Sequence, residues 1–167
     1  MGCSFTWGLG VEESETWPSQ LAKYLGQSIR NLGSIGASPE RVWMTYLELR
    51  QLYTPRLTII QWPNINRSVS IEQGRIRDLG PWNLSTDIDY ARRVFSGEQQ
   101  QQNRLLINQA RTLEPSYQFD YYDLCDKKNW LDLGQDQLHP GPRTQKLIAE
   151  LLGPAVSILC TTSSPNS

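Results

Sequence analysis

The clearest strand pattern of the chain lies at residues 57–62, which read LTIIQW, carry no charge and are bounded by Pro55 and Pro63. β-branched and aromatic residues are enriched in strands, and a run that is apolar on both faces is typical of a buried parallel strand. Two further strands are predicted at residues 27–32 (QSIRNL) and 117–124 (YQFDYYDL).

Apolar residues recur at helical spacing between and after these predicted strands. The pattern predicts helices over residues 14–25, 38–53 and 142–152, and a long helix within residues 87–113. Ser38 is the expected cap of the second helix, and Gly153-Pro154 is the expected end of the last one. Strands that alternate with helices indicate an α/β fold with a parallel sheet.

Two further expectations concern the middle of the chain. The polar segment 66–84 contains glycines and a proline, and we interpret it as a loop over the carboxyl edge of the sheet, where such folds bind ligands. In the helix predicted at 87–113, we expect Leu105, Leu106 and Ala110 to be buried and glutamines 99–102 to face water.

The composition argues against several classes of function. The net charge is −1, whereas nucleic acid or an anionic membrane would favour a basic excess. No apolar run approaches the ~20 residues of a membrane span, and no signal peptide pattern follows Met1, so a cytoplasmic protein is expected. The three cysteines, Cys3, Cys125 and Cys160, have no zinc-site spacing and there is one histidine, which predicts free thiols, no metal and no cofactor.

The single histidine, His139, lies in a turn that also contains Asp136, three residues earlier. A general base in serine hydrolysis is an imidazole whose second nitrogen is oriented by an acceptor. Asp136 can fold back onto Nδ1 of His139 and leave Nε2 free for a nucleophile. Asp132 is a less direct alternative partner. A histidine beside an aspartate is also common in surface salt links and helix caps, so the pair alone does not establish catalysis.

The candidate nucleophile is Ser4, which lies between two glycines in GCSFTWG just before a helical region. A turn into a helix exposes a side chain at the sheet edge. Cys3 is the alternative nucleophile, as a thiolate paired with His139. Adjacent residues in a turn point in different directions, so only one of the two can face the base, and we favour Ser4.

Backbone N–H groups near glycines, and side-chain amides, are the usual donors to an oxyanion. Gly33 and Gly36 lie in NLGSIGAS, between a predicted strand and a predicted helix, and Asn64 follows the best strand. Ordinary turn formation would explain these residues equally well. The glycine spacing matches neither GxGxxG nor a Walker loop, so nucleotide binding has no support.

In this order, the blocks around these residues resemble those of the SGNH (GDSL-like) hydrolase family. The first block, Gly2-Cys3-Ser4-Phe5-Thr6, resembles GDSxT, and the last, Asp136 to His139, resembles D-x-x-H. Between them, Asn31 to Gly36 resembles N-x-x-x-x-G, and Trp62-Pro63-Asn64-Ile65 is similar to G-x-N-D. Three features depart from the family pattern: Cys3 replaces an aspartate, the third block lacks its glycine and aspartate, and only three residues precede Ser4.

The resemblance implies a triad of Ser4, His139 and Asp136, with an oxyanion hole made by the N–H groups of Ser4 and Gly36 and the side chain of Asn64. Gly33 is the less favoured donor. The implied fold is a three-layer α/β/α sandwich with a parallel flavodoxin-like sheet whose first strand is truncated, formed by residues 1–160 with a disordered tail at 161–167. The implied activity is hydrolysis of a small-molecule or glycan ester, by a short-chain esterase or a carbohydrate O-deacetylase.

A second hypothesis is a non-catalytic binding or structural module of a larger assembly with the same fold. A missing first strand favours it, because an open position in a sheet accepts a strand from a partner. The presence of Ser4, Asn64, Asp136 and His139 together favours the enzyme.

Overall fold

The computed structural model describes residues 1–112, 116–120, 124 and 127–162. Its described helices and strands are α1 (Ser4–Trp7), η1 (Glu13–Glu15), α2 (Trp17–Leu25), α3 (Pro39–Leu52), β1 (Thr58–Trp62), β2 (Ser68–Glu72), β3 (Arg75–Leu79), η2 (Pro81–Asn83), α4 (Ile88–Phe95), α5 (Glu98–Ala110), β4 (Ser116–Asp120), η3 (Lys127–Asn129) and α7 (Pro142–Thr162). Of the expected disordered tail at 161–167, residues 161 and 162 belong to α7, so this part of the prediction is wrong, and 163–167 lie outside the described residues.

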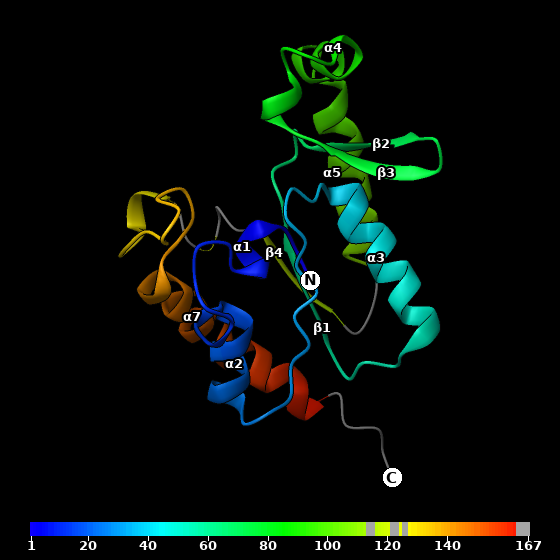
Figure 1. Cartoon of the computed structure of the whole chain (residues 1–167). Helices are drawn as coiled ribbons and strands as arrows, with labels where there is room; N and C mark the ends of the chain where they lie inside the picture. Colours follow the sequence, from blue (N-terminus) through cyan, green and yellow to red (C-terminus); the bar gives the residue numbers. More distant parts are fainter. Residues whose placement is uncertain (113–115, 121–123, 125–126, 163–167) are drawn as a thin grey trace.

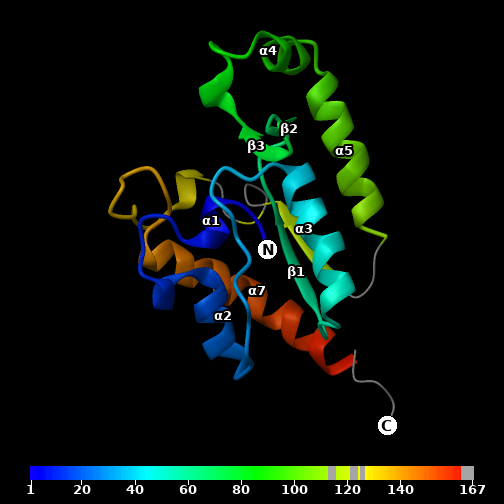
Figure 2. The same ribbon diagram turned by 45° about the vertical axis from the view of Figure 1, so that its right-hand side comes forward.

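The centre of the fold is a parallel pair of strands with helices on both sides (Figure 1). β1 and β4 pair in register from Thr58 opposite Ser116 to Trp62 opposite Asp120. Helices α2 and α7 cover one face of this pair, and α3 and α5 cover the other, as Figure 2 shows from a second angle. The structure therefore confirms the α/β class with a parallel sheet between two helical layers.

Each face of the sheet has its own hydrophobic cluster, and β1 contributes to both. Ile60 and Trp62 pack with residues of α3 and α5, whereas Ile59 packs with residues of α2 and α7. Burial on both faces explains why β1 is apolar at successive positions. The prediction for residues 57–62 is confirmed.

Met1 and Gly2 lie beside β1, in the position where the sequence predicted a truncated strand. The backbone nitrogen of Met1 donates to the carbonyl of Ile59 at 2.7 Å, and the N–H of Gln61 donates to the carbonyl of Met1 at 3.0 Å. On its other side Gly2 forms a parallel bridge with Gly33. The residues that lead into Ser4 are therefore part of the sheet.

The strand predicted at 27–32 was wrong, because the only pairing described near it is the bridge at Gly33. Of the strand predicted at 117–124, the part up to Asp120 is confirmed as β4, and 121–123 lie outside the described residues. α3 begins after the cap Ser38, as expected, and α2 begins after Thr16, whose side chain accepts from the N–H of Ser19.

The segment 66–84 is not a loop. It forms the antiparallel hairpin β2–β3, which turns at Gln73 and Gly74, both with positive φ (50° and 75°), and is followed by η2. Two residues with positive φ suit the tight turn of a two-residue hairpin. Together with α4, β2, β3 and η2 form the hairpin lobe, which projects beyond the carboxyl ends of β1 and β4 (Figure 1).

Residues 87–113 contain the expected long helix, α5, and a shorter one, α4, before it; Ser96 and Gly97, which has φ +82°, separate the two. Ala110 is buried as expected, but Leu105 is 64% exposed and Gln99 is fully buried. The Gln99 side chain donates to Oε1 of Glu40 at 2.8 Å. A polar side chain can be buried where it finds such a partner. Gln101 and Gln102 are exposed as expected and Leu106 packs against the core, so the predicted face is wrong only at Leu105 and Gln99.

The last helix, α7, continues through Gly153-Pro154, where the sequence predicted its end. Leu152 and Val156 on either side of the proline are both buried in the cluster with Trp17 and Leu21 of α2. This packing outweighs the hydrogen bond that proline removes from a helix interior. Among the described helices, none is long and apolar enough to cross a membrane.

Candidate active site

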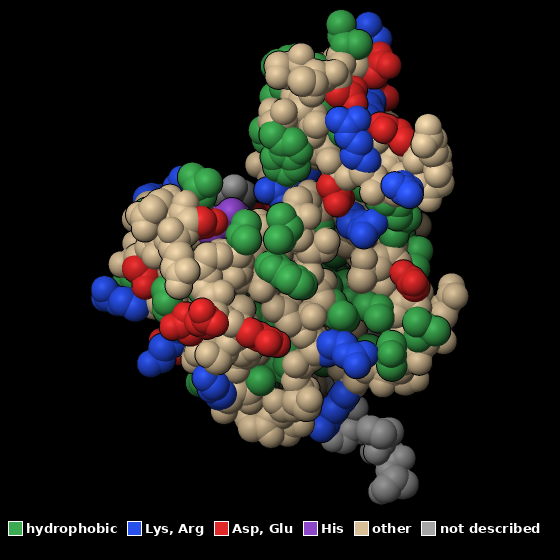
Figure 3. Space-filling view, viewed as in Figure 1, with side chains coloured by type: hydrophobic (Ala, Val, Ile, Leu, Met, Phe, Trp, Pro, Cys, Tyr) green, Lys and Arg blue, Asp and Glu red, His purple; other side chains and the backbone are tan. Residues whose placement is uncertain are grey.

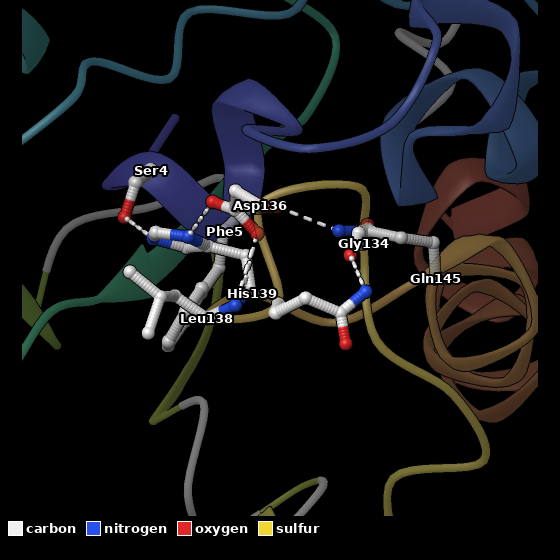
Figure 4. Close-up of polar contacts among 8 residues, drawn as sticks. Ser4, Phe5, Gly134, Asp136, Leu138, His139 and Gln145 are labelled. Carbon is white, nitrogen blue, oxygen red and sulfur yellow. Dashed lines mark hydrogen bonds and ion pairs between the residues drawn. The ribbon is translucent and has the colours of Figure 1, made fainter.

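The structure brings together three of the predicted site residues (Figure 4). His139 Nε2 lies 3.0 Å from Ser4 Oγ, and His139 Nδ1 lies 2.5 Å from Asp136 Oδ2. A hydroxyl within hydrogen-bond reach of an imidazole, which is itself oriented by a carboxylate, is the geometry of a nucleophile, a base and an orienting acid.

Asp136 and His139 are held by the short loop that joins η3 to α7. The loop is closed by an antiparallel bridge between Leu133 and Pro140, and the N–H of Gly134 donates to the carbonyl of His139 at 2.8 Å. Asp136 Oδ1 accepts the N–H groups of Leu138 and His139, each at 3.1 Å. Asp136 Oδ1 thus stabilises the turn, while Asp136 Oδ2 contacts the imidazole ring of His139.

These contacts also set the charge of Asp136. Burial acts to raise its pKa, but the N–H of Leu138, the His139 ring and the N–H of His139 together hold the pKa of this carboxyl below its ordinary value. Asp136 therefore remains a carboxylate over the working range of an imidazole base, as an acceptor for Nδ1–H must.

The alternative partner, Asp132, has another role. Its two carboxylate oxygens accept the N–H groups of Arg143 and Thr144, each at 2.9 Å, in the first turn of α7. Asp132 thereby caps the helix that follows the His139 loop.

Ser4 is the first residue of α1 and is only 3% exposed. Behind it, Gln145 of α7 donates to the carbonyl of Phe5 at 3.3 Å, and Asn31 donates to the carbonyl of Thr6 at 2.8 Å. The ring of Phe5 packs edge-on against that of His139, with centroids 5.3 Å apart. The short helix that carries Ser4 is thus fixed to the last helix, to residue 31 and to the imidazole.

Cys3, the alternative nucleophile, is buried in the cluster beneath the site. Burial raises the pKa of its thiol, so the thiolate is disfavoured. The hydroxyl of Ser4, not the thiol, faces His139. Cys3 and Cys160 are both free, and Cys125 lies outside the described residues.

Gly36 and Asn64 are not in hydrogen-bond contact with Ser4. Gly36 has φ +78° in the turn before α3, and Asn64 Oδ1 accepts the N–H of Asn66 at 2.8 Å, which leaves the amide N–H groups of Asn64 as its donors. Ala37, the residue after Gly36, packs in the same buried cluster as Cys3 and Trp62. Gly33, the other candidate, uses its N–H to bond Asn31 Oδ1 at 3.0 Å.

The comparisons with known proteins agree with this fold. A solved structure described as a "putative lipolytic protein of G-D-S-L family" from Desulfitobacterium hafniense DCB-2 is similar over 92% of this chain and 95% of that chain, with a TM-score of 0.55 and 15% identity. No family model and no curated protein matches the sequence. The likeness supports the α/β architecture.

Sequence reasoning missed Gln145 and Asn103, which hold the site from behind. Gln145 accepts the N–H of Trp17 at 2.9 Å as well as bonding Phe5, and Asn103 donates to the carbonyls of Ile65 and Arg67 at 2.8 and 2.7 Å. Their only sequence signal is a polar residue at an otherwise buried helical position. Among the described residues, no group of three His, Cys, Asp or Glu side chains is arranged to hold a metal ion.

Proposed function

We propose that the chain is a serine hydrolase that cleaves carboxylic esters. The observation that carries the proposal is the continuous series from Ser4 Oγ through the two ring nitrogens of His139 to Asp136. The similar fold of a protein named as lipolytic supports the same reaction class.

In the proposed reaction, His139 Nε2 takes the proton of Ser4 Oγ as this oxygen attacks the ester carbonyl. The N–H groups of Ser4 and Gly36 and the amide of Asn64 stabilise the oxyanion. His139 then protonates the departing alcohol, which leaves an acyl-Ser4 intermediate. A water molecule then attacks the acyl carbon as it gives a proton to His139, and His139 returns this proton to Ser4 Oγ as the carboxylic acid leaves. Asp136 keeps Nδ1 protonated and stabilises the imidazolium.

Two tryptophans, Trp7 and Trp82, are each 53% exposed, whereas Trp62 is buried. Exposed aromatic faces suit a sugar as well as a small ester. The proposed substrates are therefore short-chain esters or O-acetylated carbohydrates.

The direct test is turnover of p-nitrophenyl acetate by Ser4→Ala. We expect kcat to fall by at least about 10³-fold, since the nucleophile is lost. In the same assay, Asn64→Ala should lower kcat by roughly 10²–10³-fold with less change in KM. Turnover by Ser4→Ala equal to that of the wild type would refute the mechanism.

Labelling with a fluorophosphonate probe distinguishes the proposed enzyme from the alternative function, a non-catalytic binding module. Covalent labelling that disappears in Ser4→Ala supports the enzyme. A folded wild-type protein that neither reacts with the probe nor hydrolyses esters supports the module.

A further inference from the structure

A positively charged side chain lies beside the proposed oxyanion donor Gly36. Arg67 follows β1 in the loop that also contains Asn64, and its Nη1 donates to the carbonyl of Ala37, the residue after Gly36, at 3.2 Å. The guanidinium carbon of Arg67 is 5.4 Å from the ring centroid of Trp82. Arg67 thus connects the loop of Asn64 with the turn of Gly36.

Trp82 completes this wall of the site. A Cβ atom placed on Gly36 would lie 3.7 Å from Cζ2 of Trp82, so the indole edge is in van der Waals range of the turn. In the space-filling view, the histidine (purple) lies at a notch between the body of the molecule and the hairpin lobe, and Lys or Arg surface (blue) borders the same notch (Figure 3).

Arg67 has hydrogen-bonding capacity that the protein does not use. Its Nε is buried and has no hydrogen-bond partner, and no carboxylate of the described residues lies within 4.0 Å of its guanidinium nitrogens. A guanidinium has five N–H donors in a planar fork that matches a carboxylate. A partly buried arginine without an ion pair is expected to attract an anionic group.

Among the described residues, neither Glu40 nor Asp78 forms an ion pair with Arg67, although each has one buried carboxylate oxygen without a hydrogen-bond partner. Oε1 of Glu40 accepts from Ser68 at 3.2 Å and from Gln99 at 2.8 Å. Burial raises the pKa of Asp78, and of the cations that oppose this rise Arg41 acts more strongly than Arg67. Neither carboxylate neutralises Arg67 by direct contact.

The backbone of Arg67 is fixed before any ligand arrives. Asn103 of α5, fully buried, donates to the carbonyls of Ile65 and Arg67, and the hydroxyl of Tyr90 in α4 donates to the carbonyl of Asn66 at 2.5 Å. A recognition side chain on a braced loop loses less conformational entropy on binding than one on a free loop.

We propose that Arg67 is a specificity residue that binds a carboxylate on the substrate, so that the preferred esters are anionic, with the carboxylate on the same side of the site as Gly36 and Trp82. This inference rests on the proposed ester hydrolysis at Ser4. The preferred substrates would all have a carboxylate near the ester bond, on either the acyl part or the alcohol part.

The experiment compares two matched pairs of esters. For the acyl part, p-nitrophenyl hemisuccinate is compared with p-nitrophenyl methyl succinate. For the alcohol part, 4-acetoxybenzoate is compared with its methyl ester. The measured quantity is the ratio of kcat/KM for the anionic ester to that for the neutral one, in the wild type and in Arg67→Gln. Intrinsic reactivity cancels when the same ratio is compared between proteins.

We expect Arg67→Gln to lower this ratio by about 10- to 100-fold for at least one pair, mainly through KM, because a hydrogen bond to a charged group is worth about that factor. Arg67→Lys should retain part of the preference. The matched control Arg77→Gln, an exposed arginine of β3 paired with Glu72, should keep the wild-type ratio. The anionic preference should also weaken as salt is added.

Equal ratios in the wild type and Arg67→Gln for both pairs, with both proteins folded by their melting curves, would overturn the inference while leaving ester hydrolysis intact. If no ester is hydrolysed, the proposed function fails instead. Calorimetric titration of Ser4→Ala with 4-acetoxybenzoate and with p-nitrophenyl hemisuccinate then tests the carboxylate site independently of ester hydrolysis. Binding that Arg67→Gln removes supports the carboxylate site, and absence of binding refutes it.

Discussion

Gly10 is a single residue on which the geometry of the proposed triad depends. It has φ +88°, and its carbonyl accepts the N–H of Gln135 at 2.8 Å. A Cβ atom at this position would lie 2.8 Å from Asp136 Oδ1. The glycine therefore provides both a left-handed backbone and the space that lets the Asp136 turn approach.

Replacing Gly10 by alanine tests this dependence against a matched control. Gly26 also has a left-handed φ, +61°, but a Cβ there would have no atom within 4 Å. Both Gly10→Ala and Gly26→Ala should cost about 1–2 kcal/mol of unfolding free energy, from the backbone conformation. Only Gly10→Ala should also lower kcat, by up to about 100-fold, because the Asp136 turn is displaced. Equal kcat values in the two variants would contradict the role of Gly10.

At the residue scale, the sequence predicted the contact between Asp136 and His139, because their spacing specifies it. Asp136 and His139 are three residues apart, so a single turn brings them together. Arg67 could not be assigned, because its position depends on contacts with Ala37 and Trp82, which lie 30 residues before it and 15 after it. Such contacts exist only once the hairpin lobe has folded.

At the element scale, the first turn of α7 depends on Asp132. Burial acts to raise the pKa of this carboxyl, but hydrogen bonds from the N–H groups of Arg143 and Thr144 and the Thr144 hydroxyl hold it below its ordinary value. Because the folded protein binds the proton less readily than the unfolded chain does, the carboxylate stabilises the fold above the pH where the unfolded group titrates. This contribution is lost as the pH falls through the lower pKa of the folded state.

Asp132→Ala should therefore reduce the free energy of unfolding by about 1 kcal/mol at pH 7, the usual cost of losing a helix cap. The difference from the wild type should narrow as the pH falls below about 4, the ordinary titration range of an aspartate. Urea unfolding of both proteins between pH 7 and pH 3 measures this difference in the free energy of unfolding. A difference that stays constant over this range would exclude a role for the ionised carboxylate.

Element predictions succeeded where one local signal dominated and failed where packing decided. β1 and α3 were predictable from an apolar run and from a Ser-Pro start. The end of α7 was not, because Gly153 lies against the Tyr24 ring, where a Cβ would come within 2.5 Å of Cε1. The glycine serves the contact between α7 and α2 and does not end the helix.

At the scale of the whole molecule, Gln145 joins three segments that are distant in sequence. It is fully buried on α7, accepts the N–H of Trp17 at the start of α2, and donates to the carbonyl of Phe5 in α1. The first N–H groups of a helix have no partner within it, so Gln145 provides one for α2.

Gln145→Ala should lower the free energy of unfolding by about 1–3 kcal/mol, since it leaves a buried N–H without an acceptor. Lys146→Ala is the control, because Lys146 is exposed and its ion pair with Glu150 is 3.7 Å long. It should change the free energy of unfolding by less than about 0.5 kcal/mol. Thermal and urea unfolding measure both variants. Equal destabilisation by the two substitutions would show that Gln145 does not join these segments.

The α/β class of the molecule followed from the alternation of strand and helix patterns. The placement of Met1 and Gly2 within the sheet did not, because three residues are too few to show a strand pattern. Hydrogen bonds to β1 decide that position, and their partner residues lie nearly 60 positions away.

The contact between Ser4 and His139 spans 135 residues of the chain. A ribosome that adds ~5–20 residues each second needs roughly 7–27 s between these two residues. The serine therefore emerges long before the imidazole that would activate it. If Ser4 acts as proposed, a chain cut short before residue 139 lacks the base and is expected to leave esters intact.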